Sequence, residues 1–210
     1  MREIRKGKEP TSLTQYRSGP GANYDGLPYK DMLREHLVRE QRGLCCYCLS
    51  RIRPEPGSTK IEHWHCQAHY SAEQLEYSNL LGACMGNEGR PGREQHCDTR
   101  KGDQDLSRNP ANPSHRVEDL IRFLGDGTVS SSDPGFDAEL NKVLNLNSPF
   151  LKNNRVSMLT AFKSELERGG VSRAKLERWL GEWNGESRSG ELQPFCQVVV
   201  YWLRKRLARL

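Results

Sequence analysis

Apolar residues recur at helical spacing in four stretches of this chain. The first runs from Tyr29 to Arg42, and Gly43 would end it. Three more follow residue 150: Gly169-Gly170 would stop one, Ser172 would cap the next, and Pro194 would open the last. Their apolar faces consist of Leu151, Met158, Leu159, Phe162 and Leu166, of Leu176, Trp179, Leu180 and Trp183, and of Phe195, Val198, Val199, Trp202, Leu203 and Leu207. The C-terminal region is therefore predicted to be mostly α-helical.

The other segments have different patterns. Residues 1–29 are rich in Pro, Gly and Ser/Thr and are predicted to form an extended arm. Residues 50–100 show short β-like runs that Gly and Pro interrupt. Residues 120–129 predict a small hairpin around the turn Gly125-Asp126-Gly127. We therefore expect an α+β protein with three segments: a basic arm and helix (1–43), a cysteine-rich core (44–110), and a hairpin with helices (111–210).

Composition excludes several classes of protein. The 210 residues have a mean hydropathy of -0.82, and 28% are charged. No apolar run is long enough to cross a bilayer, and the basic start of the chain lacks the apolar core of a secretion signal, so a cytoplasmic protein with no membrane contact is expected. The net charge of +5 is uneven: residues 1–60 hold 12 Lys/Arg against 7 Asp/Glu, and residues 61–111 hold 5 against 8. This distribution suits a cation site beside a phosphate-binding surface.

The last predicted helix ends in four basic residues, Arg204, Lys205, Arg206 and Arg209. Cations in this position stabilise the helix dipole, and contact with nucleic acid is the alternative use.

Six of the seven cysteines lie between residues 45 and 97, and Cys196 lies in an apolar helical pattern typical of a core. An odd number without an export signal favours metal ligands over disulfides. The C-x2-C spacing of Cys45 and Cys48 lets two thiolates converge on one zinc ion, and Cys84 and Cys97 would complete a tetrahedral structural site. Cys46 should point away. Rival ligands are Cys66, His69 and His96, and four buried free thiols are the plain alternative.

Five further residues, three between the cysteines and two just after Cys97, could carry out phosphodiester hydrolysis. That reaction needs a base for water and a hard cation for the developing charge. His63 is the candidate base, and Glu62 and Asp98 are candidate ligands of the cation. The amide of Asn79 could orient the His63 ring, and Lys101 could contact phosphate.

Each of these residues also has an ordinary structural interpretation. A histidine in a polar stretch is usually a surface residue, Asn79 could cap a turn, and Asp98 could be a helix N-cap. His65, His69 and His115 are interpreted as ordinary residues, with His65 the first exception. Their order between two cysteine pairs favours the catalytic interpretation.

Cys45 to Gly102 resembles the zinc-bound HNH (ββα-metal) endonucleases, through C-x2-C, Glu62-His63, Asn79-Leu80, Cys84 and Cys97-Asp98. The resemblance implies two strands and a helix around one divalent ion. It also implies His63 as the general base, Asn79 as the middle asparagine, and Glu62 with Asp98 as the ligands of the metal. The last cysteine pair is wider than usual, and Asp98 stands at a position where Asn or His is common.

More narrowly, residues 1–10, 33–45 and 123–155 are similar to the PtuB family, the HNH subunits of Septu-type and retron-linked anti-phage defence systems. That similarity implies a PtuA-like ATPase partner, with the helical C-terminal region as an interface. We therefore expect an endonuclease that uses Mg²⁺ or Mn²⁺, with DNA favoured over RNA as substrate. The alternatives are a zinc-stabilised module that binds nucleic acid or a partner without catalysis, and a thiol enzyme built on Cys45 and Cys48, for which no thioredoxin-like pattern exists.

Overall fold

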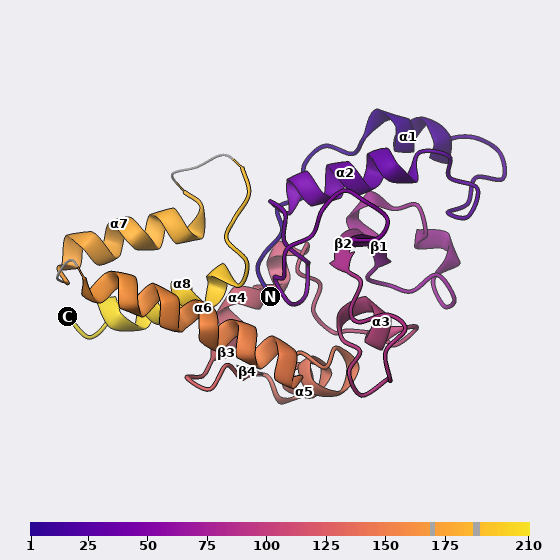
Figure 1. Ribbon diagram of the computed structural model, residues 1–210. Helices are drawn as coiled ribbons and strands as arrows, with labels where there is room; N and C mark the ends of the chain where they lie inside the picture. The colour runs from indigo at the N-terminus through magenta and orange to yellow at the C-terminus, as the bar shows by residue number, and fades with distance from the viewer. Residues whose placement is uncertain (169–170, 187–189) are drawn as a thin grey trace.

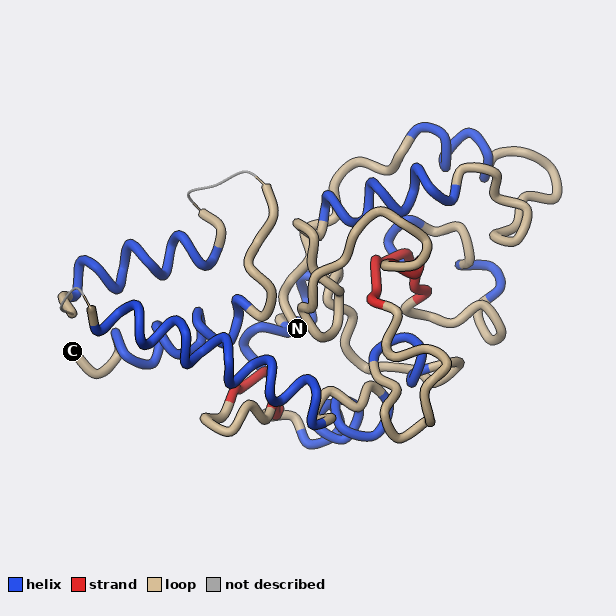
Figure 2. Tube along the Cα trace, viewed as in Figure 1, coloured by secondary structure: helices blue, strands red, loops and turns tan. Residues whose placement is uncertain are grey.

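The computed structural model describes residues 1–168, 171–186 and 190–210 (Figures 1 and 2). Its helices are α1 (Thr11–Arg17), α2 (Lys30–Glu40), α3 (Cys97–Lys101), α4 (Val117–Leu120), α5 (Pro134–Ala138), α6 (Pro149–Glu167), α7 (Arg173–Asn184) and α8 (Cys196–Leu207). Its strands form two antiparallel pairs, β1 (Thr59–His63) with β2 (Leu80–Cys84), and β3 (Ile121–Phe123) with β4 (Val129–Ser131). Single turns of 3₁₀-helix cover Ser71–Glu73, Tyr77–Asn79 and Pro113–His115, and a π-helical turn covers Glu139–Val143. No helix in these ranges is long and apolar enough to span a membrane.

The β1–β2 pair lies between α2, which precedes it in the sequence, and α3, which follows it (Figure 1). Glu62 faces Leu81 and His63 faces Leu80 across the ladder, while α2 packs on both strands and α3 packs on β2. Gln41, buried at the end of α2, donates hydrogen bonds to the carbonyls of Leu44 and Gly82 and accepts one from the Gly82 amide. This side chain therefore ties the helix, the strand and the cysteine-bearing turn together.

The predicted extended arm is partly wrong, because residues 11–17 form α1. Leu13 is 2% exposed and joins an apolar cluster with Leu33, Leu37 and Leu80. The sequence signal was weak because the helix is short and only Leu13 and Tyr16 supply apolar contacts. The tertiary contacts, rather than an amphipathic pattern, account for this helix.

The helices of the C-terminal region agree with the prediction. Ser172 accepts a hydrogen bond from the Lys175 amide and caps α7, and the predicted hairpin is present as β3–β4. The last helix begins two residues later than expected, because Phe195 adopts a left-handed conformation with φ +56°. The predicted stop at Gly169-Gly170 lies outside the described residues.

Three tryptophans surround one phenylalanine in the C-terminal region. The ring of Phe162 in α6 lies 5.2, 5.4 and 5.8 Å from Trp179, Trp183 and Trp202, each in an edge-to-face arrangement. These rings thus stabilise the packing of α6, α7 and α8. A single apolar cluster continues from here through the cysteine turn to Met1 and includes residues from all three predicted segments.

Replacing Gln41 by Met should lower the free energy of unfolding by about 3 kcal/mol, because the Leu44 carbonyl and the Gly82 amide would lose their partner in a buried place. Denaturant unfolding followed by tryptophan fluorescence measures this. Gln104→Met is the matched control, since Gln104 is exposed and makes one bond to the Lys101 carbonyl; its effect should stay within about 0.5 kcal/mol. Equal effects of the two changes would contradict the bridging role of Gln41.

Candidate metal centre and adjoining acid–histidine cluster

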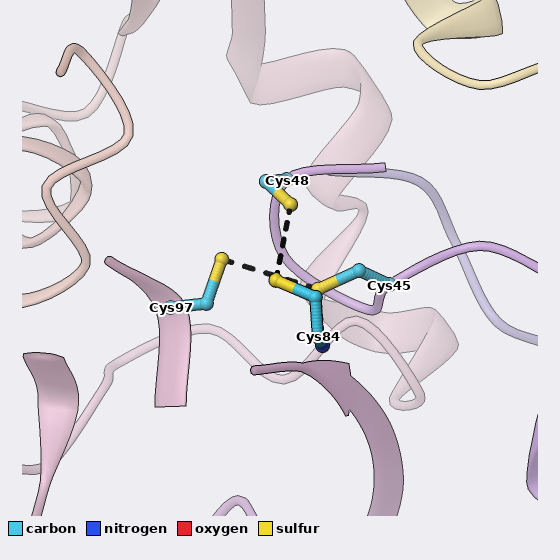
Figure 3. A group of neighbouring side chains, drawn as sticks. All are labelled: Cys45, Cys48, Cys84 and Cys97. Atoms are coloured by element: carbon cyan, nitrogen blue, oxygen red, sulfur yellow. Dashed lines mark hydrogen bonds between the residues drawn. The ribbon is translucent and has the colours of Figure 1, made fainter. Parts of the chain in front are cut away.

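Four buried cysteines converge at the junction of the cysteine turn, β2 and α3 (Figure 3). Their sulfur atoms all lie within 4.8 Å of one another. The Sγ atoms of Cys45 and Cys97 are 3.9 Å apart, and those of Cys48 and Cys84 are 3.7 Å apart. Tetrahedral zinc with bonds of about 2.3 Å needs sulfurs about 3.8 Å apart. The cluster therefore fits a zinc ion, and all seven cysteines are free thiols.

Backbone amides support this cluster from both sides. The Cys84 amide donates to Cys45 Sγ at 3.3 Å, and the Ser50 amide donates to Cys48 Sγ at 3.4 Å. Such donors stabilise thiolates and fix their orientation around a metal. A site with four protein ligands is closed to substrate, so this zinc would be structural.

The rival ligands Cys66 and His69 do not belong to this group. Cys46 is buried, and its sulfur does not belong to the group either. His96 Nδ1 lies 3.2 Å from Cys97 Sγ, so the ring packs against the cluster without completing it. Within the described ranges, these four cysteines are the one group of three or more His, Cys, Asp or Glu residues whose ligand atoms lie close enough together to hold a metal ion.

The segment between Cys84 and Cys97 loops back onto the same junction. The amide of His96 bonds to the Gly86 carbonyl at 3.0 Å, and Thr99 Oγ1 donates to the Met85 carbonyl at 2.9 Å. Gly86 has φ +55°, and a Cβ there would meet the His96 carbonyl at 2.1 Å, which explains the glycine. The twelve residues between Cys84 and Cys97 thus form a loop whose two ends are hydrogen-bonded to each other, so the two cysteines remain close despite their long spacing.

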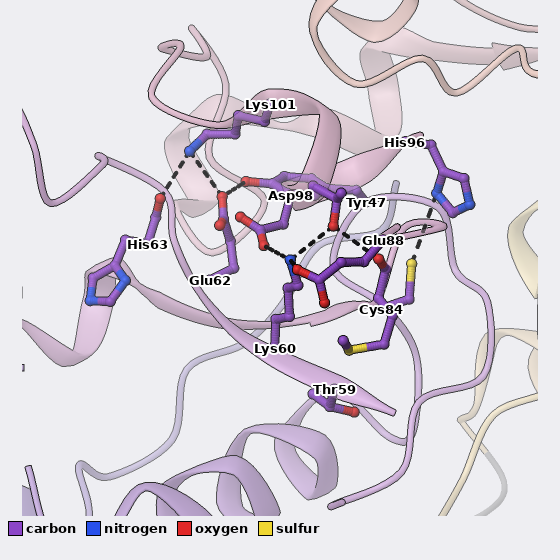
Figure 4. Close-up of polar contacts among 12 residues, drawn as sticks. Tyr47, Thr59, Lys60, Glu62, His63, Cys84, Glu88, His96, Asp98 and Lys101 are labelled. Atoms are coloured by element: carbon purple, nitrogen blue, oxygen red, sulfur yellow. Dashed lines mark hydrogen bonds and ion pairs between the residues drawn. The ribbon is translucent and has the colours of Figure 1, made fainter. Parts of the chain in front are cut away.

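Glu62 lies next to this centre, in a buried polar group (Figure 4). Tyr47, from the cysteine turn, donates its hydroxyl proton to Glu62 Oε1 at 2.6 Å. Lys101 Nζ lies 3.0 Å from the same oxygen and 3.0 Å from the His63 carbonyl. Turn, strand and helix therefore meet at one carboxylate.

Asp98 brings a second carboxylate to Glu62. Burial raises the pKa of Glu62 well above its usual value, and the adjacent Asp98 raises it further, while Lys101 and Tyr47 oppose the shift. Lys60 Nζ lies 3.6 Å from Asp98 Oδ2 and 2.7 Å from Glu88 Oε1. Two adjoining carboxylates repel each other unless a proton or a cation lies between them. The chemistry of this pair therefore fits a hard divalent cation.

His63 is buried and held in one orientation. Its Nε2 lies 3.0 Å from the Gln74 carbonyl, and its ring makes an edge contact with Tyr24 at 4.4 Å. Burial lowers the pKa of His63, while the Gln74 carbonyl and the charge of Asp98 oppose the shift. Because a carbonyl only accepts, this contact assigns the proton to Nε2 and leaves Nδ1 as a basic nitrogen.

The structure uses Asn79 differently from the expectation that its amide orients the His63 ring. Asn79 Oδ1 accepts from the His65 amide at 2.7 Å, and Nδ2 donates to the carbonyls of His65 and Glu73. Asn79 therefore holds the 65–73 loop, which leads to the Gln74 carbonyl. The ring itself is oriented by that backbone group.

Lys101, expected to contact phosphate, makes buried contacts within the protein. Its side chain is 1% exposed, and its ammonium is taken up by Glu62 and the His63 carbonyl. Long basic side chains normally reach into water, and this one does so only if its buried ion pair is broken. Lys101 is a partner of Glu62.

Sequence reasoning missed Tyr47, Tyr24 and the Gln74 carbonyl. Tyr47 stands between two cysteines of the predicted zinc site, so its position was a usable signal. A backbone carbonyl leaves no trace in residue identity, and Tyr24 lies in a segment predicted to be an arm. The contacts of the Gln74 carbonyl and of Tyr24 with His63 depend on the tertiary structure alone.

No protein-family model matches the chain. A protein of Escherichia coli, named as the candidate HNH endonuclease of retron Ec83, is 30% identical to it over 99 residues. The match covers 41% of this chain and 38% of that protein, so little more than a third of the relative's length is spanned. The chain is thus distantly similar to a candidate HNH endonuclease, and its four-cysteine cluster fits a zinc-bound module of that kind.

Replacing Cys45 and Cys48 together by Ser should abolish zinc binding, because two of the four converging sulfurs are lost. Elemental analysis of the purified protein measures the metal. The matched control is Cys46→Ser with Cys66→Ser, which removes two buried thiols outside the cluster and should leave one zinc per chain. Zinc that persists in the first variant, or disappears in the second, would refute the ligand set.

Replacing Lys101 by Met should lower the free energy of unfolding by about 3 kcal/mol, because it leaves a buried carboxylate without its cation. Arg100→Met, at the exposed neighbouring position, should change it by at most about 0.5 kcal/mol. Binding of nucleic acid to Lys101→Met should keep the salt dependence of the wild type. A flatter salt dependence with unchanged stability would restore the phosphate role.

Proposed function

We propose that this protein is a metal-dependent HNH endonuclease that hydrolyses phosphodiester bonds of nucleic acid, with DNA favoured over RNA. The observation that carries the proposal is a buried histidine with a basic Nδ1 within electrostatic reach of Asp98, whose carboxylate adjoins that of Glu62. The charge of Asp98 acts on both Glu62 and His63, so the three groups belong to one electrostatic site. The distant similarity to a candidate HNH endonuclease supports the same class.

In this proposal, His63 Nδ1 accepts a proton from the attacking water. The Gln74 carbonyl maintains the required tautomer, and Asn79 acts as a positioning residue through the loop that it holds. Glu62 and Asp98 would hold Mg²⁺ or Mn²⁺. Such an ion neutralises charge on the phosphate oxygens and the leaving group when it is bound.

The zinc would have a mechanical part in this proposal. It would join the turn that carries Tyr47 to the end of β2 and to the start of α3, which carries Asp98. β1, β2 and α3 would then form the ββα-metal core that the sequence pattern predicts. Metal ligation would then add to the apolar packing of the cysteine turn and β2.

We also propose the narrower assignment, a PtuB-like nuclease of a Septu-type or retron-linked defence system with a PtuA-like ATPase partner. Its support is the similarity of residues 1–10, 33–45 and 123–155 to that family, together with the retron in the name of the Escherichia coli protein. Because Trp179 and Trp183 pack against Phe162, an interface on the C-terminal helices would use other side chains.

One observation favours the second candidate, a zinc-stabilised binding module without catalysis. Glu62 already has Lys101 as a buried partner, and Lys60 lies near Asp98. Carboxylates neutralised by ammonium groups need no divalent cation. The orientation of His63 has no purpose in a module of this kind, and we therefore rank it second.

His63→Ala should lower cation-dependent cleavage of plasmid DNA at least about 100-fold, because the proton acceptor is lost. Gel assays with Mg²⁺ or Mn²⁺ on plasmid, single-stranded DNA and RNA measure the activity and identify the substrate class. His69→Ala is the matched control: His69 is exposed, lies on the loop that follows β1 and should keep wild-type activity. Both variants should keep the zinc and the folded state.

A wild-type protein that binds nucleic acid but does not cut it with either cation would support the binding module. The assay should then be repeated with the ATPase partner, since cutting that appears only in the complex, and is lost in His63→Ala, would support the gated nuclease. Cleavage that survives in His63→Ala would remove the catalytic assignment.

A further inference from the structure

A hollow of about 230 Å³ lies at the C-terminal end of α8, between that helix, α6 and the β3–β4 turn. In Figure 1 the end of α8 lies far from β1, β2 and α3 in the view. The hollow is lined by Phe123, Leu124, Gly125, Leu159, Lys163, Val198, Tyr201, Trp202, Lys205, Arg206 and Arg209. None of these residues belongs to the acid–histidine cluster.

One face of α8 supplies five of the eleven lining residues. Residues 198, 201, 202, 205 and 206 are three or four positions apart and therefore lie on the same side of a helix. Val198 and Leu159 are buried and form an apolar floor. The helical repeat thus places the rings of Tyr201 and Trp202 next to the apolar floor, and the charged groups of Lys205 and Arg206 at the edge of the hollow.

The rim is strongly positive. Lys205, Arg206 and Arg209 are exposed, Lys163 is half-buried, and the lining contains no carboxylate. The ion pair of Arg204 with Glu118 lies on another side of α8 and does not neutralise this face. Four cations in a lining that contains no carboxylate attract a polyanion.

The aromatic rings give the hollow a second chemistry. Lys205 Nζ lies 5.5 Å from the ring centre of Tyr201, and Lys163 Nζ lies 5.6 Å from that of Trp202. Both lysines have flexible stems, so a planar group could take their places over the rings while the ammonium groups move to an adjoining anion. Phe123 braces Tyr201 by an edge contact at 5.9 Å.

We propose that this hollow binds a base and its flanking phosphates in a single strand of nucleic acid. Rings that stack with bases beside cations that follow the backbone are the features by which proteins bind single strands without sequence preference. The volume is below the roughly 300 Å³ at which sites for drug-sized molecules begin, which fits one base rather than a cofactor. The site would give the substrate of the proposed nuclease a second contact, so in that respect it rests on the proposed function.

An acidic protein segment is the rival occupant. It would satisfy the four cations equally well but would leave the faces of Tyr201 and Trp202 without a planar partner. The rings therefore favour nucleic acid, and the test separates charge from stacking.

The test uses the zinc-loaded full chain with His63→Ala, so that binding is measured without cleavage. The probe is a fluorescein-labelled oligo-dT of 20 nucleotides, and anisotropy is recorded over a range of salt concentrations. The triple change Lys205→Gln, Arg206→Gln and Arg209→Gln should weaken binding at least tenfold. It should also lower the slope of log affinity against log salt by about 2, the value for three lost phosphate contacts on a single strand.

The matched control is Arg173→Gln, Lys175→Gln and Arg178→Gln on α7, which removes the same charge and also a lysine that lies over a ring, that of Trp179. Its affinity should stay within twofold of the parent. Tyr201→Leu keeps every charge and should weaken oligo-dT binding about tenfold. The same change should leave binding of heparin, which has no bases, unaltered.

Unchanged oligo-dT binding in the α8 triple variant would overturn the proposal. Equal loss in the α7 control would also overturn it, because the effect would then be one of net charge. If Tyr201→Leu binds oligo-dT like the parent while folding normally, the face recognises anions alone, and an acidic partner replaces the single strand. If the wild type cuts nothing, alone or with the ATPase partner, while the variants show the expected binding pattern, the result would uphold this site and reject the nuclease.

Discussion

Convergence of four buried sulfurs is the constraint on which the rest of the molecule depends. Cys45 and Cys48 lie in a turn, Cys84 ends a strand and Cys97 begins a helix, so a zinc ion would join three elements that are separate in sequence. Those elements bring Tyr47 and Asp98 to Glu62 on β1, and polar contacts of this kind need placement to within a fraction of an ångström. A metal can add such placement to that supplied by apolar packing.

Charge compensation is the second constraint. Glu62 is buried with Lys101, and this pair is stable only because Tyr47 and the His63 carbonyl complete its hydrogen bonds. The buried ammonium offsets the charge of Glu62, and Lys60, which also pairs with Glu88, lies 3.6 Å from Asp98. Both carboxylates therefore have an ammonium group nearby. Lys101 also contacts the backbone of His63, because its ammonium group donates a hydrogen bond to the His63 carbonyl.

The sequence predicted correctly those features that depend on residues close together in the chain. The C-x2-C spacing, the apolar repeats of α6, α7 and α8, and the glycine-rich turn before β4 were visible in the sequence because each depends on neighbours a few positions away. Helix α1 was missed because Leu13 gains its stability from residues twenty or more positions later. The burial of Lys101 and the use of the Gln74 carbonyl were beyond reach for a similar reason: residue type does not state which partner tertiary structure will supply.

The loop between Cys84 and Cys97 has both ends fastened, by two sulfurs of the cluster and by the bonds of His96 and Thr99 to Gly86 and Met85. Entropy of closure grows only with the logarithm of loop length, so doubling this loop would cost about 0.6 kcal/mol. Glu88 at its centre reaches Lys60 beside Asp98. Length can therefore vary here over evolutionary time at little cost in stability, and each new length would present a different rim to whatever approaches the acidic pair.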